Sequence, residues 1–133
     1  MTVLLRAASA RNGKQVRKFV LDGADPSAAD GQGLTALHYA AIDGSTELAR
    51  TLLECGPAGL AWCEAPGGET SLWVASAFGH LDVAKMLIEA GGEELLLKTN
   101  KKGISCLFVA CGKGLLEVAK ALIKAGEIGR AHV

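Results

Sequence analysis

The feature that most constrains this chain is an internal repeat with a period of 35 residues. The stretches TALHYAAIDG, TSLWVASAFG and SCLFVACGKG begin at Thr35, Thr70 and Ser105. Each match continues into a second stretch: STELARTLLECG, HLDVAKMLIEAG or LLEVAKALIKAG. An earlier copy begins at Thr2, 33 residues before Thr35. Such self-similarity is typical of solenoids. We therefore expect one repeat domain over residues 1–126, with units at about 1–30, 31–65, 66–100 and 101–126.

Each unit carries two short helical patterns. In the first, Leu37, Ala40 and Ala41 stand at i, i+3 and i+4, which places a narrow apolar stripe on one helix face. In the second, larger residues such as Leu48 and Leu52 recur at helical spacing. The small residues of the first pattern favour close packing between helices. The sequence therefore predicts a pair of short helices in every unit.

Loops rich in Gly, Pro, Asp and Asn separate the units. Asp30 and Asn100 each stand three residues before a glycine, and Asx side chains of this kind bond to their own backbone in turns. Ala65 occupies the corresponding position in the loop between them. That loop is therefore predicted to have a looser turn.

The repeat resembles the ankyrin family, whose units read T-P-L-H-x-A-A-x-x-G and continue into a second helix and G-A-D. TALHYAAIDG and GADPSAADGQGLT match this pattern closely. The histidine of the pattern is kept at His38, and Trp73 and Phe108 replace it in later units. The resemblance implies an all-α ankyrin-repeat solenoid of stacked helix–turn–helix pairs with projecting loops.

The resemblance also implies a protein–protein interaction module, a scaffold or adaptor, which contacts its partner through loop tips and the ends of the first helices. On this sequence those positions are Gln32, Leu34, Ile42, Asp43, Glu69, Ala77, Phe78, Lys101, Lys102, Ile104 and Lys113. Phe78 and Ile42 are the expected apolar anchors. For Ile42, packing beneath the loops is an equally good interpretation. The charges change from acidic at Asp43 and Glu69 to basic at the lysines.

Composition argues against several other classes of protein. The chain has 14 basic and 14 acidic residues, whereas nucleic-acid binding normally shows a basic excess. No apolar run approaches the roughly 18 residues that suggest a membrane span. The N-terminal sequence does not resemble a signal peptide. We therefore expect an intracellular protein, cytoplasmic or nuclear, with reduced thiols and no small-molecule substrate.

We expect no enzyme activity, catalytic residue, metal or cofactor. Cys106 and Cys111 lie five apart, about 140° around a helix, whereas zinc ligands on one helix favour i, i+3 or i+4. Both cysteines, and Cys55, align with small residues of sister units, which favours packing. Cys63 lies in a loop and is expected to be the most exposed. His38 and His80 are interpreted as structural.

The last seven residues, EIGRAHV, depart from the repeat. They resemble a translated sequencing adapter, in which the frame that encodes these seven residues continues into a stop codon. We therefore expect 127–133 to be a non-native tail. The apolar second helix of the last unit also predicts an uncapped end, hence a fragment of a longer array. An alternative is the regulatory or targeting region of a larger enzyme, such as a kinase or ubiquitin ligase.

Overall fold

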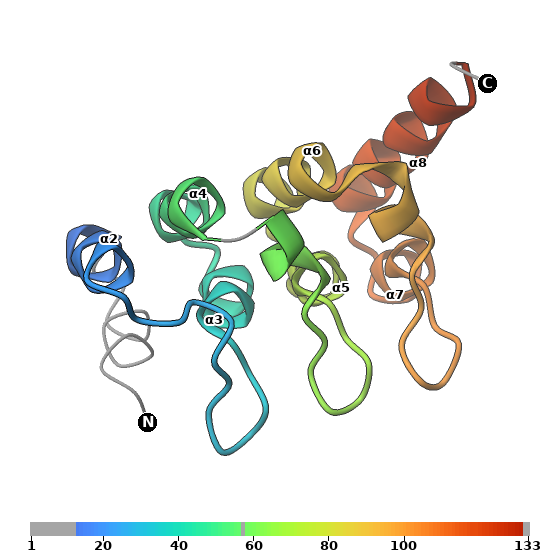
Figure 1. Cartoon of the computed structure of the whole chain (residues 1–133). Coiled ribbons are helices and arrows are strands. Elements are labelled where there is room, and N and C mark those ends of the chain that lie inside the picture. The colour runs from blue at the N-terminus through green and yellow to red at the C-terminus, as the bar shows by residue number, and fades with distance from the viewer. Residues whose placement is uncertain (1–12, 57, 132–133) are drawn as a thin grey trace.

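The helices stack in two rows, from which the loops project on one side (Figure 1). The computed structural model describes residues 13–56 and 58–131, except for the side chains of 58, 93 and 127–131. The predicted first helix of the first unit therefore lies outside the described residues. The elements are α2 (Gly13–Leu21), α3 (Ala36–Asp43), α4 (Thr46–Cys55), η1 (Ala58–Trp62), α5 (Ser71–Phe78), α6 (Leu81–Leu97), α7 (Cys106–Gly112) and α8 (Leu116–Ala131).

Side-chain caps and glycines set the limits of the first helices. Thr35, Thr70 and Ser105 are the N-caps of α3, α5 and α7, and each side-chain oxygen accepts the backbone N–H three residues on. Gly44 and Gly79 end α3 and α5 with φ of 72° and 78°, a region that costs residues with a Cβ more than it costs glycine. The repeated Thr or Ser therefore marks the start of each of these helices, and the repeated glycine marks the end of α3 and α5. α7 differs, since it ends at Gly112 with Lys113 as its C-cap.

The core runs along the array between the two rows. α3 packs against α5, and α5 against α7, while α2, α4, α6 and α8 pack in succession in the second row. Leu37, Leu48, Leu72 and Leu87 are fully buried where the rows meet. Among the described residues the only β feature is an isolated bridge between Thr99 and Ser105. The prediction of an all-α repeat solenoid is confirmed.

Two connections predicted as loops contain helical turns. The connection after α4 forms η1, and α6 resumes beyond a kink at Gly92, where φ is 74°. Leu60 in η1 and Leu95 in α6 occupy equivalent positions, and both are fully buried. Burial of these leucines gives each connection an apolar contact with the core, so the prediction of plain loops is wrong here.

The turn at Ala65 is also tighter than the sequence suggests. Asp30 Oδ1 and Asn100 Oδ1 accept two backbone N–H groups each in their loops. Ala65 cannot do this, yet its N–H donates to Glu69 O at 2.8 Å and its carbonyl accepts from Gly68 N at 2.8 Å. Both bonds recur in the sister loops. The backbone pattern alone therefore closes the turn.

Candidate protein-binding surface

The eleven predicted contact residues fall into two groups at opposite ends of the first helices. The loop row consists of Gln32, Leu34, Glu69, Lys101, Lys102 and Ile104, and the helix-end row consists of Ile42, Asp43, Ala77, Phe78 and Lys113. α3 and α5 have eight residues each, so roughly 12 Å of helix separates the rows. The structure does not gather the eleven residues into one pocket. It arranges them along two edges of the array.

The loop row is fastened to the preceding unit by side chains from the first helices. His38 Nε2 donates to Glu69 O at 2.9 Å, and Trp73 Nε1 donates to Ile104 O at 3.0 Å. The two bonds join equivalent positions, 31 residues apart in each case. Trp73 therefore takes over the link that His38 makes. The sequence alignment pairs these residues but does not reveal their shared bond.

The bonds of His38 define its tautomer. Nδ1 accepts from Thr35 N–H at 3.2 Å, which leaves the proton on Nε2 for the bond to Glu69 O. Burial lowers the pKa of His38 below its ordinary 6.5, and the Glu69 carbonyl opposes this effect. The imidazole is therefore neutral, and its two bonds agree with the structural role that the sequence predicts. His80 is structural too, since its Nε2 lies 2.8 Å from Ile42 O of the preceding unit.

Phe78 is the most prominent apolar residue of the helix-end row. Its side chain is 53% exposed. The rings of Phe78 and His80 are stacked with centroids 6.4 Å apart, and Lys113 Nζ lies 5.6 Å from the Phe78 ring centre. The His80 ring is itself held by Ile42 O. Phe78 is thus a large apolar side chain that is accessible and held on two sides.

The other predicted contact residues differ in accessibility. Gln32, Lys101, Lys102 and Lys113 are exposed, whereas Leu34, Asp43, Glu69 and Ile104 are half-buried. Ile42 is half-buried and packs against the core, in line with its alternative interpretation. Ala77 is only 4% exposed, so it supports the surface from beneath and offers little area to a partner.

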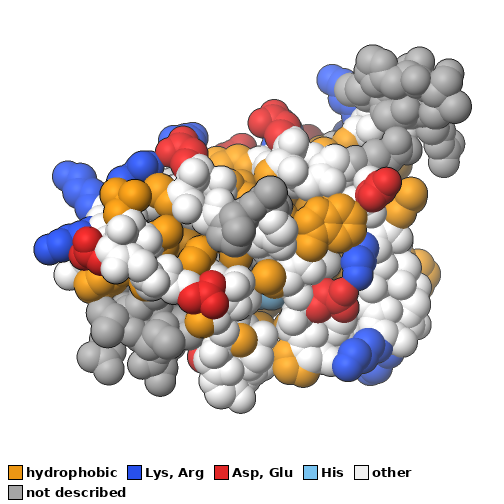
Figure 2. Space-filling view, in the orientation of Figure 1, with side chains coloured by type: hydrophobic (Ala, Val, Ile, Leu, Met, Phe, Trp, Pro, Cys, Tyr) orange, Lys and Arg blue, Asp and Glu red, His pale blue; other side chains and the backbone are white. Residues whose placement is uncertain are grey.

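Both signs of charge contribute to the surface. Within the described part of the chain, Lys101, Lys102 and Lys113 form no ion pair. The loop row therefore changes from acidic at Glu69 to basic at Lys101 and Lys102. On the face seen in Figure 2, acidic, basic and apolar side chains are interspersed, without a broad area of one sign.

The structure exposes a different cysteine from the one that the sequence analysis predicts. Cys106 is fully buried, and burial raises its pKa to about 11. Cys55 and Cys63 are half-buried, while Cys111 is exposed. The prediction that Cys63 is the most exposed, with Cys111 packed, is wrong because nothing described in the structure covers the outer side of α7. No group of metal-ligating side chains gathers within the described residues.

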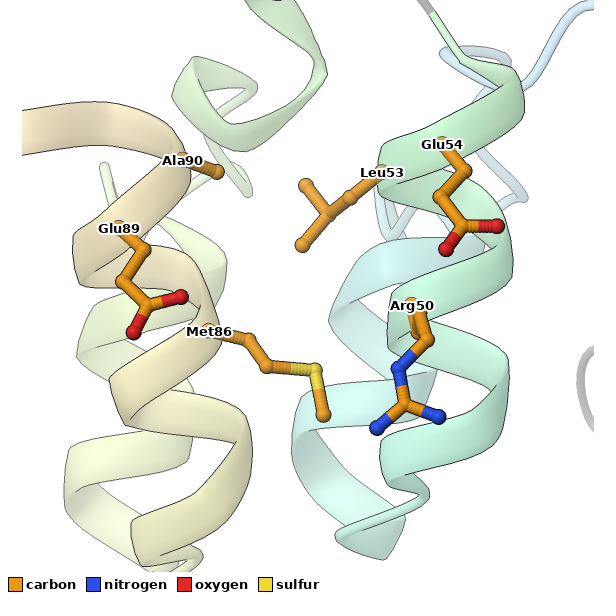
Figure 3. A pocket seen from close by; sticks show the side chains of 6 residues that line it. All are labelled: Arg50, Leu53, Glu54, Met86, Glu89 and Ala90. Carbon is orange, nitrogen blue, oxygen red and sulfur yellow. The ribbon is translucent and has the colours of Figure 1, made fainter.

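A shallow groove of about 370 Å³ lies between α4 and α6 in the second row. Leu53 and Met86 project into it from opposite sides, and Ala90 lies near one end (Figure 3). Glu54, at its edge, forms an ion pair with Arg17 at 2.8 Å. The sequence analysis did not predict this groove, since its half-buried apolar residues match the ordinary core pattern of the second helix.

Stacked helix pairs with loops fastened to the preceding unit define a helical repeat solenoid. A family profile described as ankyrin repeats (3 copies) matches residues 4–96. The chain belongs to the ankyrin repeat family, whose members are generally protein–protein interaction modules. A search of curated proteins found no match to it. No helix in the described residues is long and apolar enough to cross a membrane.

Proposed function

We propose that this array binds a partner protein through the loop row and the helix-end row together, with Phe78 as the apolar anchor. The observation that carries the proposal is Phe78 itself, which is 53% exposed yet held between His80 and Lys113. Accessible aromatic residues often contribute most of the energy of an interface. Because the ring is already held by its neighbours, binding loses little of its conformational entropy.

The loop row supports the same proposal. The backbone at Glu69 and Ile104 is fixed by His38 and Trp73, so the adjacent loop tips keep their spacing before a partner arrives. Lys101 and Lys102 then present positive charge at one end of the row. We expect a partner with acidic groups opposite these lysines and an apolar side chain opposite Phe78. Such charges contribute to orientation and association rate more than to affinity.

The test is a comparison of captured proteins between variants of the full chain. Phe78→Ala should weaken capture of the main partner at least about tenfold, as expected for an interface anchor. Leu97→Ala is the matched control, because Leu97 is 70% exposed but lies outside both rows. Lys113→Glu should weaken capture of an acidic partner. Lys85→Glu makes the same charge change at an exposed position on α6, outside both rows, and should not weaken capture.

A stability measurement separates binding from folding. Truncation of a buried Phe typically costs about 3–5 kcal/mol. Phe78→Ala should cost clearly less, since half of the side chain is already in water. A core-sized loss, or equal loss of capture by Phe78→Ala and Leu97→Ala, would overturn the role assigned to Phe78.

We further propose that the chain is a scaffold or adaptor segment of a longer array. This is supported by the open face of the fourth unit, where Leu107 and Phe108 are 37% and 68% exposed. The alternative is that the chain is a regulatory or targeting arm of a larger enzyme, which would present the same surface. A full-length transcript separates the two: a catalytic motif set favours the arm, and further repeats alone favour the scaffold.

A further inference from the structure

The groove between α4 and α6 repeats a junction that an ion pair closes one unit earlier. At that earlier junction, Arg17 on α2 binds Glu54 on α4 at 2.8 Å. One unit further along, the two equivalent positions are occupied by Arg50 on α4 and Glu89 on α6. The sequence therefore places the same two partners of an ion pair across the groove.

The repeated pair is open in the structure. Arg50 and Glu89 are exposed and lie on opposite sides of the groove (Figure 3). Neither side chain forms an ion pair with any described residue. At the next junction, between α6 and α8, the equivalent positions are Lys85 and Lys124, which have like charges. Of the three equivalent pairs, only Arg50 and Glu89 therefore combine opposite charges with no ion pair between them.

The size of the apolar side chains accounts for the open junction. Leu53 and Met86 line the groove, whereas the equivalent residues at the junction of α2 and α4 are the smaller Val20 and Thr51. Thr51 is only 6% exposed, while Leu53 and Met86 are half-buried. α4 and α6 also contact each other less extensively than α2 and α4 do. Accessible apolar surface therefore lies between two unpaired charges of opposite sign.

An occupant that matches the groove must supply three groups. An apolar side chain between Leu53 and Met86 would remove their accessible surface from water. A carboxylate would pair with the guanidinium of Arg50, whose donors match the two oxygens of a carboxylate. An ammonium or guanidinium group would pair with Glu89.

The polarity of the groove is fixed by the ion pair at its edge. Glu54, the other carboxylate that lines the groove, is already paired with Arg17. The free charges are therefore positive on α4 and negative on α6, which orients an occupant across the groove. A small molecule would stay largely in water in a groove this shallow, whereas a polypeptide segment can extend beyond it.

We infer that the groove between α4 and α6 binds a short segment of a partner protein that carries an apolar side chain between an acidic and a basic residue. The groove lies in the second row of helices, so it is separate from the loop row and the helix-end row. The inference therefore goes beyond the function proposed for Phe78 and does not depend on it.

A methionine methyl signal gives a direct test, because the chain has only two methionines, Met1 and Met86. The probes are peptides selected on the full chain from a display library of random short sequences. Peptides that also bind the double variant Arg50→Glu, Glu89→Lys are removed. The retained peptides should share an apolar residue between an acid and a base. Each should shift the ¹³C-methyl signal of Met86 and leave that of Met1 unchanged, with Met86→Leu used to assign the two signals.

Single charge changes test the orientation of the bound peptide. Arg50→Glu should weaken binding roughly tenfold, since an attraction becomes a repulsion, and replacement of the peptide's acid by Lys should restore it. Lys85→Glu is the matched control and should leave the affinity unchanged, because Lys85 is the equivalent exposed residue on α6 but does not line the groove. An unchanged melting temperature shows that each variant is folded, and Arg50→Gln replaces Arg50→Glu if it is not.

Three results would overturn the inference. One is a selection that yields no peptide dependent on the two charges, since the groove then has no such occupant. Another is a bound peptide that leaves the Met86 signal unchanged, since it then binds elsewhere. The third is equal weakening by Arg50→Glu and Lys85→Glu, since the effect is then one of net charge. Phe78→Ala should leave the Met86 shift in place, so failure of the groove and failure of the surface proposed for Phe78 are distinguishable.

Discussion

The bond between Trp73 and Ile104 offers a direct test of how the loop row is held. Trp73→Phe removes the indole N–H that donates to Ile104 O at 3.0 Å and keeps an aromatic ring. Phenylalanine is also what the chain itself has at the equivalent position, Phe108. The change therefore removes one bond between the third and fourth units with little alteration of shape.

The expected loss can be worked out from the contacts. Ile104 O also accepts Asn100 N–H at 3.0 Å, so its carbonyl keeps a partner and the loss is that of one ordinary hydrogen bond, about 0.5–1.5 kcal/mol. The smaller, half-buried ring adds about 0.5 kcal/mol of lost apolar burial. We expect Trp73→Phe to lower the free energy of unfolding by about 1–2 kcal/mol.

Equilibrium urea unfolding measures this loss, and hydrogen exchange shows where it acts. Amide protection should fall most in the loop around Ile104 and in α7. The matched control is Phe108→Trp, which adds the indole where no following loop is described and should change stability by less than about 0.5 kcal/mol. No measurable loss for Trp73→Phe would refute the link, and a loss of about 3–5 kcal/mol would indicate a packing role instead.

Three further predictions concern buried polar groups. Burial lowers the folded pKa of His38 below 6.5. The unfolded chain therefore takes up a proton first as pH falls. The stability that neutral His38 contributes is therefore present above about pH 7 and is lost as pH falls below about 6.5. His38→Gln should flatten this part of a stability–pH profile, and an unchanged slope would contradict the assignment. Ser71 Oγ is buried without a hydrogen-bond partner among the described residues. Ser71→Ala, the residue type of Ala36, should leave the unfolding free energy unchanged or raise it by up to about 1 kcal/mol, and a loss above about 1 kcal/mol would indicate a missed bond. Cys106, with its pKa raised to about 11, should resist alkylation at pH 8 until urea unfolds the chain, whereas labelling at the rate of Cys111 would contradict its burial.

The repeat predicts the fold because residues that begin and end helices recur at the same positions in each unit. Thr35, Thr70 and Ser105 supply the caps, and Gly44 and Gly79 supply the helix ends. Four concordant copies make an accidental pattern implausible. The helical turns near Leu60 and Leu95 were not predicted. Each connection has one fully buried leucine within a short apolar stretch, Leu60–Trp62 or Leu95–Leu97, and such a stretch is too short to give a helical period.

The candidate surface was predicted less completely than the fold. Position in the repeat identifies Phe78 and Lys113 as outward-facing, but not the ring stacking and cation contact that hold the phenyl group. The same logic fails at Ala77 and Cys111. Alignment predicts the accessibility of both residues from the equivalent positions in other units. Accessibility depends instead on what packs over each residue: Ala77 is covered, and Cys111 lies on the open outer face of the fourth unit.

Site-specific photo-cross-linking tests the central claim, partner binding through the helix-end row, most directly. A benzophenone analogue of phenylalanine is placed at position 78 of the full chain and, in a second protein, at the exposed position of Leu97. The account predicts that irradiation in cells yields a discrete protein adduct from position 78, and none of that mass from position 97. No adduct from position 78, or the same adduct from both positions, would contradict it.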